Sequence, residues 1–99
     1  MSGAKVVLIV DVQNIKDKDI FEKHLKREGL KKVENEDFAY EGEAHTHIFN
    51  TRAYILDVVS KGLSKTSFDS CKIIFQIGEN PVEAYIYEKM KKEFRQAEV

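Results

Sequence analysis

The sequence has few of the residues that mark secreted, membrane and disordered proteins. It contains one cysteine, one proline, five glycines and no tryptophan among 99 residues. A lone cysteine, Cys71, cannot form an intrachain disulfide and fits a reducing compartment. The longest apolar run lies within Lys5–Val10 and is too short for a membrane span or a signal-peptide core. We therefore expect a cytoplasmic protein with no membrane contact and no low-complexity linker.

The charges of the chain nearly cancel. Sixteen Lys and Arg stand against seventeen Asp and Glu, which gives a formal net charge of -1. This balance lacks the overall positive field of a dedicated nucleic-acid binder, so RNA or DNA would have to bind a local patch. A chain of this length can bury one hydrophobic core but not two. We predict that residues 1–99 form a single domain.

Two segments with the composition of buried strands predict the centre of a sheet. They are Lys5–Val12 and Ser70–Ile77, and we expect them to be neighbours. The first segment is so rich in β-branched residues that it predicts a strand buried on both faces. The second is centred on Ile73 and Ile74, and Ile74 is predicted to be a core residue.

Two amphipathic helices are predicted from apolar residues spaced three and four apart. The first begins at Asp17 or Asp19 and ends at Gly29, and the second begins at Asn50 or Thr51. The side chains expected to face the core are Ile20, Phe21, His24 and Leu25 in the first helix, and Ala53, Leu56, Val59 and Leu63 in the second.

A third helix is predicted at the C-terminal end. The residues at 80–83, Asn-Pro-Val-Glu, combine a cap residue, a proline at the first helical position and a glutamate three residues after the cap. Its inward stripe would be Val82, Ile86, Met90 and Phe94, and its basic face Lys89, Lys91, Lys92 and Arg95. Because glutamates are interspersed among them, these basic residues indicate a solvated face more than a phosphate site.

The segment 31–49 is expected to supply the two remaining strands, which lie between the first two predicted helices. Apolar and polar residues alternate on both sides of Gly42, with Ala44, Thr46 and Ile48 on its C-terminal side, which predicts a hairpin or a bulged strand pair. The resulting β-α-β-β-α-β unit is the ferredoxin-like α+β sandwich, with the additional C-terminal helix. The alternative is a three-layer α/β sheet with a third parallel strand in this segment.

A homodimer is expected on general grounds. A small sheet with an open edge is commonly protected by pairing with a second copy. Three aromatic residues in a strongly charged segment, Phe38, Tyr40 and Phe49, support this expectation.

Asp11 is the principal candidate for a functional residue. It follows the apolar run at the point where ligands and metals often bind to a sheet. Oxygen ligands of this type suit Mg²⁺ or Mn²⁺, so Asp11 is predicted as both a metal ligand and a catalytic residue. The alternative is a turn role, in which the carboxylate accepts amides of the loop 12–16.

Glu43, His45 and His47 form a second candidate group. On a strand they would share a face and could offer two imidazoles and a carboxylate to a metal. Same-face neighbours lie about 6.6 to 7 Å apart, which is too far for all three to reach one ion without a bulge. A polar outer strand face is the favoured interpretation, and His24 is interpreted as a core or interface histidine.

Three motifs resemble the small ferredoxin-fold subunit of CRISPR adaptation and the VapD-type endoribonucleases. They are the strand end Leu8-Ile9-Val10-Asp11, the segment Tyr40-Glu41-Gly42-Glu43, and the strand Asp69-Ser70-Cys71-Lys72-Ile73-Ile74-Phe75. The resemblance implies a homodimer in which Asp11 of both protomers approaches a metal at the interface. Of the site residues that the resemblance implies, only Asp11 can be assigned in this sequence.

The segment Val10-Asp11-Val12-Gln13-Asn14 is similar to the first motif of NYN/PIN-like ribonucleases. This second resemblance implies several acidic residues around Mg²⁺, and Asp57 and Glu79 are the residues that would join Asp11.

Two functional hypotheses follow. One is a metal-dependent endoribonuclease, or a nuclease-derived subunit that interacts with RNA or DNA, centred on Asp11. The other is a noncatalytic, dimeric, ferredoxin-like binding or assembly module.

Overall fold

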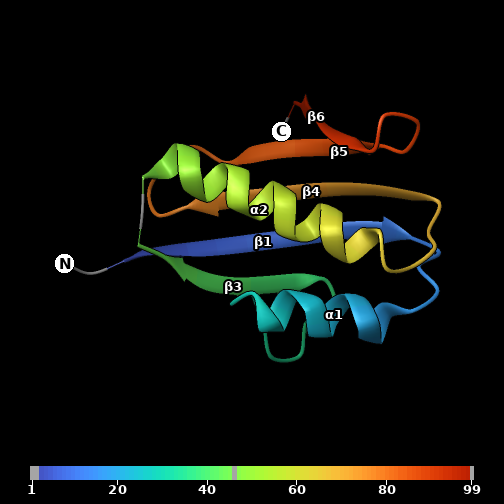
Figure 1. Cartoon of the computed structure of the whole chain (residues 1–99). Coiled ribbons are helices and arrows are strands. Elements are labelled where there is room, and N and C mark those ends of the chain that lie inside the picture. The colour runs from blue at the N-terminus through green and yellow to red at the C-terminus, as the bar shows by residue number, and fades with distance from the viewer. Residues whose placement is uncertain (1–2, 46, 99) are drawn as a thin grey trace.

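The computed structural model describes residues 3–45 and 47–98. Within these residues the chain forms an antiparallel six-stranded sheet, with two helices on one of its faces (Figure 1). The helices are α1 (Lys18–Arg27) and α2 (Ile48–Leu63). The strands are β1 (Ala4–Gln13), β2 (Lys31–Lys32), β3 (Ala39–Ala44), β4 (Ser70–Ile77), β5 (Glu83–Glu88) and β6 (Glu93–Ala97). The α+β class is therefore confirmed.

The sheet has the strand order β2-β3-β1-β4-β5-β6. Leu8 on β1 pairs with Phe75 on β4 and with Tyr40 on β3, so the prediction that β1 and β4 are central neighbours is confirmed. The elements from β1 to β4 follow the expected β-α-β-β-α-β order. The alternative with a third parallel strand is wrong, because every adjacent pair of described strands is antiparallel.

The core lies between the sheet and the helices, and the other face of the sheet is open. Side chains alternate across a strand, so only every second residue of β1 meets the helices. Val7 and Ile9 point to the open face and are 39% and 45% exposed. The prediction of a strand buried on both faces is wrong, because β1 is apolar on both faces but covered on one. The fully buried side chains of the core include Leu8, Val10, Phe21, Leu25, Tyr40, Ile55, Val59, Leu63, Ile73 and Phe75.

Helix α1 agrees closely with its prediction. Phe21, His24 and Leu25 are buried as expected, while Ile20 is exposed and its assignment to the core is wrong. The N-cap residue is Asp17, although its side chain makes no capping hydrogen bond. Gly29 follows the helix with φ +97°, a backbone conformation that glycine adopts without strain.

Helix α2 begins earlier than predicted, and the set of residues that it turns toward the sheet differs from the predicted set. His47 is the N-cap, and its Nδ1 accepts a hydrogen bond from the amide of Phe49 at 3.2 Å. The predicted core residue Ala53 is exposed, because the helix turns a different stripe toward the sheet. That stripe comprises Thr51, Ile55, Val58, Val59, Gly62 and Leu63.

The segment around Gly42 forms one continuous strand, so the predicted hairpin or bulge at this glycine is wrong. Gly42 lies inside β3 and pairs with Val6 of β1. A Cβ atom there would lie 2.6 Å from the carbonyl oxygen of Gly29, so the glycine permits a close approach of two backbones. The hairpin partner of β3 is the short β2. Thr46, part of the predicted alternation, lies outside the described residues.

The predicted C-terminal helix is wrong, because this part of the chain forms the hairpin β5–β6. Asn80 does not cap a helix, since its Nδ2 donates to the carbonyl of Ile77 at 2.8 Å within a turn. Met90 lies in the hairpin loop and is 98% exposed, although it was predicted to be buried. None of the helices in the described part of the chain is long and apolar enough to cross a membrane.

Candidate functional site

Asp11 lies within β1, two residues before the strand ends, and points to the open face of the sheet. It is exposed and stands opposite Lys72 of β4 in the register. Its Oδ1 accepts a hydrogen bond from Nε2 of Gln13 at 2.9 Å. Among the described residues no Lys or Arg lies within ion-pair distance of this carboxylate. The bond from Gln13 is a contact within the strand and not the turn role considered from the sequence.

The turn after β1 is held by Asn14 and Asp69. Asn14 has φ +55°, and its Nδ2 donates to Oδ2 of Asp69 at 2.6 Å. The amide of Asp69 donates to the carbonyl of Gln13 at 2.9 Å. These bonds join the end of β1 to the loop before β4 and position the end of the strand that carries Asp11.

The structure does not bring Asp57 and Glu79 to Asp11. Asp57 lies on α2 and pairs with Lys61 at 3.0 Å. Glu79 follows β4, whereas Asp11 pairs near the beginning of that strand. In residues 3–45 and 47–98, no group of three His, Cys, Asp or Glu side chains could hold a metal ion. A cation bound at Asp11 would therefore need ligands from outside this set, such as a second copy of the chain.

The charge of Asp11 also affects the pKa of a buried residue of the core, Cys71. Cys71 pairs with Val12 at the end of β1 and is buried on the helix side. Burial, with a further contribution from the Asp11 carboxylate, raises the pKa of the Cys71 thiol to about 12. The thiol is therefore protonated at neutral pH, and little of the nucleophilic thiolate is present.

An apolar groove lies on the open face beside Asp11. It has a volume of about 220 Å³ and is lined by Val7, Ile9, Ile74, Phe75, Gln76 and Val82. Ile9 and Ile74 are cross-strand neighbours in the register, so they form the centre of this strip. Ile74 is half-buried and belongs to the open face, so its assignment to the core is wrong. Val7 and Ile9 reach this face because they alternate with the core residues of β1.

Charged side chains flank this groove on both sides. Glu41 and Glu43 project from β3 on one side, since they pair with Val7 and Lys5 of β1. Lys72 of β4 and Arg95 of β6 lie on the other side, through their pairing with Asp11 and Ile86. The open face is thus apolar at the centre, with charges of both signs around it, because Lys5 pairs with Glu41 on the β3 side and Arg95 pairs with Glu88 on the β6 side.

The structure separates the histidines of the second candidate group. His45 and Glu43 lie 3.6 Å apart, between Nε2 and Oε2, and both are exposed. His47 caps α2 instead of sharing their strand face. His24 is buried as interpreted from the sequence, and neither of its ring nitrogens has a hydrogen-bond partner.

The expected basic helix face is replaced by residues of the hairpin. Lys89 donates from Nζ to the carbonyl of Phe68 and lies 4.9 Å from the centroid of the Phe68 ring. Arg95 pairs with Glu88 at 3.1 Å across β5 and β6.

Comparison of the chain with protein-family models, with curated proteins and with solved structures finds no match.

Proposed function

We propose that this chain is a ferredoxin-like assembly module that works as a homodimer through the open face of its sheet. The observation that supports the proposal is the apolar strip formed by Val7, Ile9 and Ile74 on a face that no helix covers (Figure 1). A sheet can bury an exposed apolar strip by packing face to face against a second sheet. A second copy offers the same patch, as an isologous interface requires.

The charges around the strip favour one arrangement of the two copies. A two-fold axis parallel to the strands, between β1 and β4, would lay the β3 side of each copy over the β5 side of the other. Glu41 and Glu43 would then approach the side of the second sheet that carries Arg95 and Glu88. Ile9 would meet Ile74, and Asp11 would meet Lys72, in each case across the interface. Apolar contact at the centre and opposite charges at the rim are typical of a specific interface.

The test is the mass of the protein in solution. Sedimentation equilibrium at micromolar concentration is expected to give the mass of two chains for the wild type and of one chain for Ile9→Lys. Phe49→Lys is the matched control, because Phe49 is exposed on α2, outside the open face, and should leave the dimer intact. A one-chain mass for the wild type, or a dimer in Ile9→Lys, would contradict the proposal.

Charge reversal tests the arrangement of the two copies. Asp11→Lys and Lys72→Asp should each weaken dimerisation by about tenfold or more, and the double variant should restore it. Thermal unfolding of each variant under conditions where it is monomeric separates this effect from a change within one chain. Additive losses in the double variant would contradict the arrangement.

A metal-dependent nuclease is the second candidate function, and the exposure of Asp11 favours it. The carboxylate accepts one hydrogen bond, from Gln13, and so retains free oxygen lone pairs for Mg²⁺ or Mn²⁺. In the dimer described above, the two Asp11 carboxylates would come to the same level of the interface. Two carboxylates from two copies would supply ligands that the described part of one chain does not, and a cation there would compete with the facing Lys72 side chains.

Metal binding and cleavage provide the test of this second function. Mg²⁺ or Mn²⁺ should raise the melting temperature of the wild type, and Asp11→Asn should abolish both that increase and any cleavage of RNA or DNA. Asn preserves the size of the side chain but removes its charge. Lack of both metal-dependent stabilisation and cleavage in a dimeric wild type would leave the assembly module as the function.

A further inference from the structure

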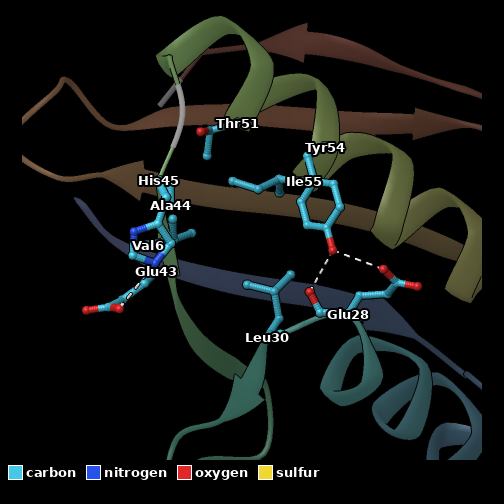
Figure 2. A pocket seen from close by; sticks show the side chains of 10 residues that line it. Val6, Glu28, Leu30, Glu43, Ala44, His45, Thr51, Tyr54 and Ile55 are labelled. Carbon is cyan, nitrogen blue, oxygen red and sulfur yellow. Dashed lines mark hydrogen bonds and ion pairs between the residues drawn. The ribbon is translucent and has the colours of Figure 1, made fainter. Parts of the chain in front are cut away.

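The helix side of the molecule has a second cavity, on the opposite face of the sheet from the groove. Its volume is about 300 Å³, and it lies between the C-terminal end of α1, strand β3 and the first half of α2 (Figure 2). Val6, Leu30 and Ile55 are buried side chains that form an apolar floor. This volume is near the lower end of the range for small-molecule sites, roughly 300 to 1,000 Å³.

The polar rim of this cavity has more acceptors than donors. Tyr54 directs its hydroxyl at Glu28, with 2.7 Å to the backbone carbonyl oxygen and 2.9 Å to Oε2 (Figure 2). A hydroxyl has one proton, so it cannot satisfy both oxygens fully at the same time. Burial and the Glu28 carboxylate raise the pKa of Tyr54, so the phenol remains a donor at neutral pH.

The other polar side chains around the cavity have partners of their own. Thr51 donates its hydroxyl proton to the carbonyl of His47 at 3.2 Å. His45 is paired with Glu43, whose carboxylate points away from the cavity (Figure 2). In the described part of the chain, no Lys or Arg lies within ion-pair distance of Glu28.

The end of α1 places the Glu28 carboxylate and the negative end of the helix dipole at this rim, with Lys26 and Arg27 in the same last turn. Glu28 is the C-cap residue of α1, where the helix dipole places partial negative charge. Gly29, the next residue, has no atoms within 4 Å of the position that a Cβ would take, so the rim is open beside it. A cation entering here would meet a carboxylate, a carbonyl and a phenol oxygen next to an apolar floor.

We propose that this cavity binds a small amphipathic cation, a protonated amine carried on an apolar body, with the ammonium at Glu28 and the apolar part over Val6, Leu30 and Ile55. The ammonium N–H groups donate to the Glu28 oxygens in place of water and add an opposite charge to the carboxylate. The apolar body displaces water from the floor, which favours binding. A neutral ligand of the same shape would displace the same water from the floor, but it would lack the ammonium group that interacts with Glu28.

NMR titration of the ¹⁵N-labelled protein with phenethylamine tests the proposal, with 2-phenylethanol as the neutral probe of matching shape. Phenethylamine should shift the amides of residues 28–30, 44–45 and 51–55, and it should bind about tenfold more tightly than the alcohol. Glu28→Gln should remove this preference. Glu79→Gln is the control, because Glu79 is exposed in the turn after β4 and does not line the cavity.

Three results would overturn the proposal. They are equal affinity for the amine and the alcohol, an unchanged preference in a folded Glu28→Gln variant, and amide shifts confined to other residues. A titration that shows no binding of the amine at millimolar concentration would do the same. None of these results depends on dimerisation through the open face.

Discussion

Arg52 of α2 and Glu83 of β5 form a bidentate ion pair that ties the C-terminal hairpin to the helix layer. Nε lies 2.5 Å from Oε1, and Nη2 lies 3.0 Å from Oε2. Tyr85 also donates its hydroxyl to Oε1 of Glu83 at 2.8 Å. The Glu83 side chain is mostly buried, so its charge depends on these two partners.

Removal of this pair is expected to destabilise the fold. Arg52→Ala should lower the free energy of unfolding by about 2 kcal/mol, because it leaves a mostly buried carboxylate without its charged donor. Urea unfolding at neutral pH measures the change. Glu41→Gln is the control, since the exposed pair between Lys5 and Glu41 should contribute less than about 1 kcal/mol. Equal effects of the two substitutions would contradict this prediction.

The contribution of the pair should disappear at low pH. Burial by itself would raise the pKa of Glu83, but the hydrogen bonds from Arg52 and Tyr85 outweigh it and hold the pKa below its usual value. A carboxyl with a depressed pKa stabilises the fold above its unfolded-state pKa, about 4.3, and this contribution is lost as the pH falls through its folded-state pKa. The difference in stability between wild type and Arg52→Ala should therefore be full at neutral pH and shrink below about pH 4. A difference that persists unchanged at acid pH would contradict the assignment.

The C-terminal hairpin shows why part of the fold could not be predicted from the sequence. Apolar residues four apart share a face in a helix, but they also share a face in a strand, because four is a multiple of the strand period. Val82 and Ile86 therefore fitted both structures, whereas Phe94 lies on β6 and packs on the helix side against Tyr87. The run Ala84-Tyr85-Ile86-Tyr87 is rich in residues that favour strands, and this preference prevailed over the cap-like sequence at Asn80.

The candidate sites were predictable to different degrees. Asp11 was found from its place at the end of an apolar strand, and β4 was predicted with its observed bounds. The open face was missed because Val7 and Ile9 are as apolar as the core residues between them, so the sequence could not reveal which face the helices cover. The cavity beside Glu28 depends on the contact between α1, α2 and β3, which no local pattern contains.

Two histidines are expected to respond in opposite ways to the same substitution. His24 is 6% exposed and has two buried ring nitrogens without hydrogen-bond partners, so His24→Leu should raise the free energy of unfolding by about 1 to 2 kcal/mol. His47→Leu should lower it by about 1 kcal/mol, because the N-cap hydrogen bond of α2 is lost. Chemical denaturation of both variants provides the comparison, and changes of the same sign would refute it.

Neighbouring isoleucines of β4 separate core packing from the open face. Ile73 is fully buried, so Ile73→Ala should lower the free energy of unfolding by about 2 to 5 kcal/mol. Ile74→Ala should cost about 1 kcal/mol in the monomer, because much of this side chain is already in contact with water. It should instead weaken the proposed dimer. Denaturation below the dimerisation range, followed by sedimentation, distinguishes the two effects, and equal losses of monomer stability would contradict the placement of Ile74.

Cys71 should be unreactive while the protein is folded. Its thiol is 2% exposed, and burial, followed by the charge of Asp11, raises its pKa to about 12, so little thiolate is present at neutral pH. Labelling with a thiol reagent should be at least about 100-fold slower in buffer than in denaturing urea, since reaction requires the β4 region to open. Asp11→Asn should change the native rate little, because burial is the larger cause. Rapid labelling of the native protein would show that the β1–β4 pairing opens readily beside Asp11.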